Sequence, residues 1–159
     1  MFQKNSKNSP ESLITKYLDP KLIVFLDVET RDSAISLLID LLDASGKLKE
    51  KKVFHDAILE REKVVSTGVG MGVAIPHAKL PGYDDFFIAI GIHRRGIPWE
   101  AIDGIPVRLV VMIGGPDNKQ TEYLQLLSKL TQEIKDEEKR KKMLQSHSGE
   151  EMIAILKGD

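Results

Sequence analysis

The stretch FFIAIGI, residues 86–92, is apolar at nearly every position. A half-exposed strand alternates polar and apolar residues, so a continuous apolar run is typical of a strand that is covered on both faces. Three other runs are apolar and of strand length, namely LIVFLDV (22–28), VAI (73–75) and VRLVVMI (107–113). The sequence therefore predicts a sheet that carries helices on both faces.

Helical spacing occurs before and after these strands. Residues 31–46 have apolar side chains three and four apart, with Asp32 or Ser33 as the N-cap and Gly46 at the stop position. Residues 49–63 repeat the pattern, with a predicted buried stripe of Val53, Phe54, Ala57 and Ile58. Both segments are predicted to be amphipathic helices.

Three more helices are expected after residue 113. The first has a stripe of Tyr123, Leu127, Leu130 and Ile134, the second is the charged segment 137–144, and the third follows a capping box of Ser148 and Glu151. Asp103-Gly104 predicts a turn between the last two strands. The predicted fold class is α/β, a three-layer sandwich. Residues 1–12 read as a disordered leader and residues 13–159 as a single domain.

Composition excludes several functions. The chain has 159 residues, with 23 Lys and Arg against 24 Asp and Glu, and so lacks the excess of cations that nucleic-acid binding requires. It has no cysteine, which excludes thiolate nucleophiles and disulfides. No signal peptide and no apolar run of about 18 residues is present, so we expect a cytoplasmic protein that is not embedded in a membrane.

The stretch STGVGMGVAIPHAKLPG, residues 66–82, carries the candidate chemistry. Gly68, Gly70 and Gly72 fit neither a dinucleotide fingerprint nor a nucleotide-binding loop, because the spacing and the flanking elements differ. Two interpretations remain. The glycines either form a plain connection with positive φ angles, or expose backbone N–H groups to an anion together with the Ser66 and Thr67 hydroxyls.

His77 lies directly after this glycine-rich segment. About three-quarters of an unperturbed imidazole is neutral at pH 7, and a neutral ring nitrogen is a nucleophile. Next to an anion-binding loop, the covalent intermediate would be a phosphohistidine. His55 and His147 read as surface residues, whereas His93 is left open between a structural and a functional role. No pair of histidines has metal-ligand spacing, so neither a metal nor a cofactor is predicted.

Four segments together resemble the fructose/mannitol-type enzyme IIA domains of the bacterial sugar phosphotransferase system (PTS), which include the nitrogen-regulatory IIA proteins. They are RE (61–62), STGVGMGVAIPHA (66–78), DGIPVRLVVMI (103–113) and LQLLSKL (124–130). They occur in the expected order, and the resemblance extends over residues 20–156. It implies a mixed sheet flanked by helices.

The resemblance also implies a phosphotransferase mechanism. His77 would accept a phosphoryl group from the carrier protein HPr, or from its nitrogen-branch counterpart, and pass it to a IIB domain. Arg61 would neutralise the transferring group. Thr67 and the backbone N–H groups of residues 68–72, with Gly68, Gly70 and Gly72, would stabilise the phosphoryl oxygens. The alternative is a stand-alone regulator whose phosphorylation controls a partner protein without sugar transfer.

Tyr123 departs from the family pattern, because members commonly carry a second histidine there. A phenol can donate a hydrogen bond to a phosphate oxygen but cannot carry a positive charge. The spacing of Tyr123 from Leu127 suits a core contact equally well. Both interpretations remain open from the sequence.

Overall fold

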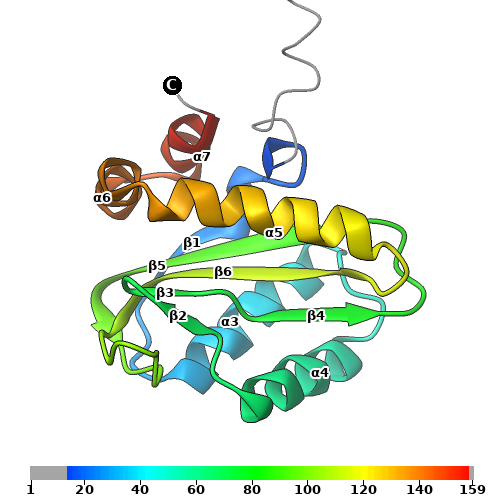
Figure 1. The fold of residues 1–159 in the computed structure, drawn as a ribbon. Coiled ribbons are helices and arrows are strands. Elements are labelled where there is room, and N and C mark those ends of the chain that lie inside the picture. The colour runs from blue at the N-terminus through cyan, green and yellow to red at the C-terminus, as the bar shows by residue number, and fades with distance from the viewer. Residues whose placement is uncertain (1–13, 158–159) are drawn as a thin grey trace, which may run out of the picture.

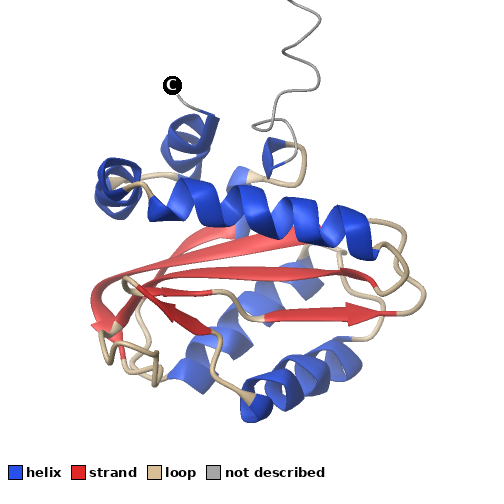
Figure 2. Cartoon of the chain, viewed as in Figure 1, coloured by secondary structure: helices blue, strands red, loops and turns tan. Residues whose placement is uncertain are grey.

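The chain is arranged in three layers in a computed structural model that describes residues 14–157 (Figure 1). A six-stranded sheet forms the middle layer. Helices α3 (Arg31–Ala44) and α4 (Lys51–Val64) cover one face. The other face carries α5 (Gln120–Lys135), with α6 (Glu137–Gln145) and α7 (Gly149–Lys157) beside it. This confirms the predicted α/β sandwich, and Figure 2 shows the separation of helices and strands into layers.

The sheet is mixed, as the family resemblance implies. Its strands are β1 (Ile23–Leu26), β2 (Gly68–Gly70), β3 (Val73–Ala74), β4 (His77–Leu80), β5 (Phe87–Ile97) and β6 (Val107–Pro116). The order is β1-β5-β6-β3-β2, and β4 also pairs with β6. β1 is parallel to β5, and β3 and β4 are parallel to β6, whereas β5–β6 and β2–β3 are antiparallel. A short 3₁₀ helix, η1 (Pro20–Leu22), leads into β1.

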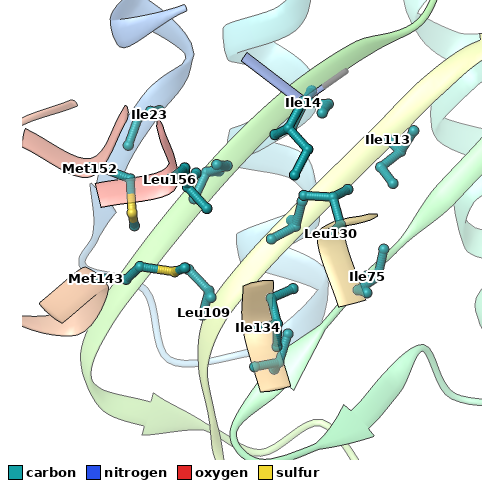
Figure 3. Close-up of a cluster of buried hydrophobic side chains, with 14 of the residues drawn as sticks. Ile14, Ile23, Ile75, Leu109, Ile113, Leu130, Ile134, Met143, Met152 and Leu156 are labelled. Carbon is teal, nitrogen blue, oxygen red and sulfur yellow. The ribbon is translucent and has the colours of Figure 1, made fainter. Parts of the chain in front are cut away.

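The continuous apolar runs form the two central strands, which are buried on both faces. In β5, every residue from Phe87 to His93 is buried. One core lies between the sheet and α3 and α4, and the other lies between the sheet and α5, α6 and α7. Figure 3 shows the second core, in which Leu130 and Ile134 of α5 lie near Ile75.

Strands β3 and β4 follow one another along the same side of β6, interrupted at Ile75 and Pro76. Proline has no N–H to donate to a ladder, but the Pro76 carbonyl still accepts from the Ile113 N–H at 2.9 Å. The next residue, His77, therefore begins β4 in register with Ile113. Among residues 14–157, β4 pairs only with β6, so His77 lies at an edge of the sheet.

The structure corrects several predicted details. The N-cap of α3 is Thr30, not Asp32 or Ser33, and its hydroxyl accepts from the Ser33 N–H at 3.1 Å. Val53 is 46% exposed and does not belong to the buried stripe of α4. The stripe instead runs along the i, i+4 row of Phe54, Ile58 and Glu62. It therefore ends in a carboxylate.

Other details are confirmed. Gly46 follows α3 with a φ of 78°. The Glu151 N–H donates to the Ser148 hydroxyl at 3.1 Å at the start of α7. The predicted turn between β5 and β6 spans residues 101–104, where the Gly104 N–H donates to the Ala101 carbonyl at 3.0 Å and Gly104 has a φ of 72°. The predicted leader, residues 1–12, lies outside the described residues. Within residues 14–157, no helix combines the length and apolar character needed to cross a membrane.

Candidate functional site

The imidazole of His77 is half-buried and held in one orientation. Alternation along β4 places Ile75, His77 and Lys79 toward α5, and Ala74 and Ala78 toward the opposite core. The Nδ1 atom of His77 lies 3.0 Å from the Ile75 carbonyl oxygen. A carbonyl only accepts hydrogen bonds, so Nδ1 carries the proton and donates it. Nε2 is therefore the unprotonated nitrogen, with its lone pair available.

Arg61 faces that lone pair from the last turn of α4. Its Nε donates to Nε2 of His77 at 3.3 Å, and its Nη1 donates to the Val65 carbonyl at 2.9 Å. The second contact anchors the guanidinium where the chain leaves the helix. The structure thus brings the two predicted catalytic residues together, with a fixed cation next to a nucleophilic nitrogen.

The surroundings of His77 favour its neutral form. Burial is the main cause that lowers its pKa, and the positive charges of Arg61 and Lys79 lower it further. The hydrogen bond to the Ile75 carbonyl and the negative charge of Glu62 act in the opposite direction. The net shift is downward, so the ring is neutral at pH 7 and Nε2 is ready to attack an electrophile.

A buried hydrogen-bond cluster lies behind this pair. The carboxylate of Glu62 accepts from the Thr67 N–H at 2.8 Å and from the Thr67 hydroxyl at 2.6 Å. The Trp99 indole N–H donates to the same carboxylate at 3.2 Å. These contacts tie the segment after α4 to the segment after β5. Glu62 was not among the candidate residues, although its position one turn beyond buried Ile58 was a usable signal.

The candidate phosphate-binding hydroxyls already have partners. Thr67 is 3% exposed, and its hydroxyl donates a hydrogen bond to the Glu62 carboxylate. The Ser66 hydroxyl donates to the Trp99 carbonyl at 3.0 Å and accepts from the Gly68 N–H at 3.0 Å. Both residues line the pocket at His77. In the unphosphorylated protein, however, the hydroxyl hydrogens of Ser66 and Thr67 stabilise the segment that follows α4.

The glycines form a tight hairpin, where a loop was expected, and do not line the His77 pocket. Gly68 and Gly70 belong to β2, and Gly70 and Gly72 have φ angles of 95° and 74°. The N–H of Met71, between them, donates to the Asp103 carboxylate at 2.9 Å. A Cβ on Gly68 would lie 2.8 Å from that of Ala101, so this position needs glycine for close packing. The geometry fits the interpretation as a connection with positive φ angles.

A pocket of about 380 Å³ opens beside His77 and Arg61. Its walls are mainly apolar and come from the β2–β3 hairpin and from α5, with Val69, Met71, Ile75, Leu127 and Ile134. Thr131 and Lys135 add polar groups from α5. The pocket is much larger than a phosphoryl group and leaves room for a side chain of a docked protein.

Tyr123 lies in the first turn of α5, against His77. The two ring centroids are 5.8 Å apart, and Tyr123 is 4% exposed. Burial raises the pKa of its hydroxyl, and the nearby Arg61 charge lowers it by less. Tyr123 also packs against Phe86 at 6.1 Å. The ring therefore belongs to the core and borders the site at the same time.

His93 lies elsewhere in the sheet. It follows Ile92, whose partner on β6 is Leu109. Leu109 lies four residues, or about 13 Å of strand, before Ile113, which is the partner of His77. Its Nδ1 accepts from the N–H groups of Arg95 and Gly96, and its Nε2 donates to the Val28 carbonyl at 2.7 Å. This histidine stabilises an irregularity in β5, which is the structural role.

The other two histidines also lie apart from the site. His147 is exposed, as predicted, whereas His55 is partly covered and lies 3.5 Å from the Ser36 hydroxyl. Trp99, which follows β5, is 1% exposed and packs in the core on the side of α3 and α4. Residues 14–157 contain no group of three or more His, Cys, Asp or Glu side chains that could hold a metal ion.

Residues 16–158 match the family model described as phosphoenolpyruvate-dependent sugar phosphotransferase system, EIIA 2, and the chain belongs to this family. It is 35% identical over 146 residues to the PTS system fructose-specific EIIABC component of Bacillus subtilis. It is 32% identical over 145 residues to a nitrogen regulatory protein of Bradyrhizobium diazoefficiens. Fructose-type and nitrogen-regulatory proteins are thus both among its relatives.

The coverage of these relatives differs. The alignment covers 91% of this chain but 22% of the Bacillus subtilis protein, whereas it covers 90% of this chain and 94% of the Bradyrhizobium protein. The fold is similar to the crystal structure of the nitrogen regulatory protein IIA-Ntr from Neisseria meningitidis. That comparison has a TM-score of 0.84 and 32% identity, and it covers 91% of this chain and 99% of that chain.

Proposed function

We propose that the protein is a phosphocarrier of the phosphotransferase system in which Nε2 of His77 is the phosphoryl acceptor. The observation that carries this proposal is the unprotonated Nε2 facing the Arg61 guanidinium at 3.3 Å, at the edge of an open pocket. The donor is a phosphorylated histidine carrier, HPr or its nitrogen-branch counterpart. The recipient is a IIB domain or, in a regulatory member, no further protein.

The transfer exchanges one phosphorus–nitrogen bond for another. The lone pair of Nε2 attacks the phosphorus in line, the bond to the donor histidine breaks, and the donor ring takes back its electron pair. Nδ1–H remains bonded to the Ile75 carbonyl, which stabilises the ring as it gains positive charge. No proton has to leave His77 before the attack.

Arg61 provides the charge that this step requires. Phosphoryl transfer depends mainly on positioning and on neutralising the equatorial oxygens, and a guanidinium can bind two of them at once. Because its Nη1 is anchored on the Val65 carbonyl, Arg61 loses little freedom when the phosphoryl group arrives. Thr67 and the hairpin glycines then act indirectly, by fixing the pocket wall.

Exposed apolar side chains near the pocket support protein docking. Val64, Val65, Val69 and Leu124 are 46–80% exposed, and Met71 is 36% exposed. Val69 and Met71 line the His77 pocket, and Leu124 lies on the neighbouring surface of α5. Apolar patches of this kind are typical of surfaces that bind other proteins. Such docking, in the cytoplasm, is what successive transfer between carriers requires.

A regulatory role is the second candidate. It is favoured by the near-complete coverage of the nitrogen regulatory relatives, at 94% and 99% of their chains. In that role, phosphorylation of His77 changes the surface next to the pocket and thereby switches the binding of a target protein. The fructose-type relative, in which A, B and C parts share one component, favours transfer to a IIB domain instead.

The test is transfer from a radiolabelled phosphocarrier in a single turnover. The wild-type protein is expected to take up one phosphoryl group, and His77→Ala none. His147→Ala is the matched control, because this histidine is exposed and far along the chain. Uptake by His77→Ala would contradict the proposal. Chasing the labelled protein with a purified IIB domain then separates the two roles, since a pure regulator would retain its label.

A further inference from the structure

Lys79 lies two residues after His77 on the edge strand β4. Alternate residues of a strand point to the same face, so both side chains face α5. The Lys79 ammonium lies 4.3 Å from the centroid of the Tyr123 ring and donates to Oε1 of Gln120 at 2.6 Å. The Tyr123 ring in turn lies 5.8 Å from the His77 ring. A cation is therefore held one side chain away from the nucleophile.

The charge at the site is incomplete when His77 is phosphorylated. A protein-bound phosphoryl group carries about −1.5 to −2 charges at pH 7, and Arg61 supplies only one positive charge. The other charged or titratable side chains acting on His77 or lying against it are Glu62, Lys79 and Tyr123. Glu62 is an acid held by three donors, and burial raises the pKa of the Tyr123 phenol. Lys79 alone among these three can add positive charge.

We propose that Lys79 is the second cation of the site and binds the phosphoryl oxygens on Nε2 of His77. This inference rests on the proposed function. On phosphorylation the ammonium leaves Gln120 and moves along the Tyr123 ring toward the new dianion. The Cα atoms of residues two apart on a strand are about 6.5 Å apart, a span that a lysine side chain bridges.

The present contacts of Lys79 allow this movement. Gln120 is exposed and provides a neutral amide oxygen, and the aromatic face provides a cation–π contact. Charge-assisted hydrogen bonds to a phosphoryl group are stronger than hydrogen bonds between neutral partners. Gln120 and Tyr123 thus hold the ammonium near the site in the unphosphorylated state and give it up when the dianion forms.

The experiment phosphorylates the protein chemically, with phosphoramidate, so that no carrier is needed. In this reaction the phosphorus–nitrogen bond of the reagent breaks, a bond to Nε2 forms and ammonia leaves. The half-life of the His77 phosphate is then followed by phosphorus NMR in wild type, Lys79→Gln and Lys79→Arg. Lys119→Gln is the matched control, because Lys119 precedes α5 and donates to the Asp84 carbonyl instead.

We expect Lys79→Gln to shorten the half-life roughly three- to thirtyfold, the effect of losing one partly exposed charge-assisted contact. A cation bound to the phosphoryl oxygens holds the negative charge that would otherwise help to expel the imidazole, and so it slows cleavage of the phosphorus–nitrogen bond. Lys79→Arg retains the charge and stays within about twofold of wild type. An unchanged half-life in Lys79→Gln, or an equal loss in Lys119→Gln, would overturn the inference.

A second measurement needs no phosphate. Since the Lys79 charge lowers the pKa of His77, Lys79→Gln is expected to raise that pKa in an NMR titration, and Lys119→Gln is expected to leave it unchanged. No rise in Lys79→Gln would also overturn the inference. Failure of a carrier to phosphorylate wild type would contradict the proposed function instead, and the chemical experiment would still decide the role of Lys79.

Discussion

The Nε of Arg61 donates a hydrogen bond to Nε2 of His77 at 3.3 Å, although the two residues come from different elements. Arg61 lies in the last turn of helix α4, and His77 begins strand β4 after the chain has passed through the β2–β3 hairpin. The cation thus faces the lone pair of a neutral ring. The positive charge of Arg61 opposes protonation of the ring. The same charge is placed to bind an anion that is bonded to Nε2.

Arg61→Ala tests this relationship through the rate of transfer. We expect transfer to slow by about ten- to a thousandfold, because one charge-assisted contact to the transferring group is lost. The melting temperature is expected to change little, since Arg61 is partly exposed and its protein contacts are few. Single-turnover transfer and thermal unfolding are measured on the same sample. A wild-type rate would exclude Arg61 from the site.

Thr67→Val separates a structural role from phosphate binding. The substitution keeps the shape but leaves the buried Glu62 carboxylate without one donor, which costs about 1–3 kcal/mol of unfolding free energy. The expected result is a clear loss of stability in denaturant unfolding with a small effect on transfer. The reverse result, intact stability with slow transfer, would make Thr67 a phosphate ligand.

Tyr123→Phe examines the hydroxyl next to His77. Within the described residues this hydroxyl has no hydrogen-bond partner, so its removal is expected to leave the melting temperature unchanged. If it donates to the phosphoryl group, transfer slows by roughly two- to tenfold, the effect of one neutral hydrogen bond. We expect that slowing in single-turnover kinetics. A silent Tyr123→Phe would restrict Tyr123 to packing and to holding Lys79.

The pH dependence of transfer follows from the lowered pKa of His77. An unperturbed histidine becomes half-protonated at about pH 6.5, and burial moves this point down in the folded protein. Transfer is therefore expected to stay constant from pH 8 through about 6.5 and to fall only below that value. A decline centred above pH 6.5 with a donor of constant reactivity would contradict the proposed environment of His77.

The same shift affects stability. Below pH 6.5 the unfolded chain binds a proton at His77 that the folded protein resists, so the stability contribution of the shift is present above that pH and lost as the pH falls. His77→Ala is expected to flatten this part of the stability curve. Denaturant midpoints between about pH 5 and 7 measure the effect. An identical slope in both proteins would show that His77 titrates normally.

The sequence predicted those parts of the fold that depend on local pattern. The apolar runs at 86–92 and 107–113 became the two central strands, and the proline before His77 coincides with the start of β4. The proximity of Arg61 and His77 came from the family resemblance. The tautomer of His77 could be assigned only from the structure, because it depends on the direction of the Ile75 carbonyl.

Other features required tertiary contacts. The partners of the Ser66 and Thr67 hydroxyls come partly from Trp99, which lies more than thirty residues further along the chain, so no local pattern indicated them. The N-cap of α3 was misplaced because Thr30, Asp32 and Ser33 are all good capping residues within one turn. Lys79 was not predicted to belong to the site, because a lysine on an edge strand is common and its contact with Tyr123 depends on tertiary structure.

The position of the phosphorus–nitrogen bond shows whether Nε2 of His77 is the phosphoryl acceptor. After incubation with a phosphorylated carrier, the ¹⁵N-labelled protein is examined by NMR for coupling between phosphorus and the ring nitrogens of each histidine. We expect coupling at Nε2 of His77, because Nδ1 is occupied by its hydrogen bond to the Ile75 carbonyl. Coupling at Nδ1 of His77, or at another histidine, would contradict it.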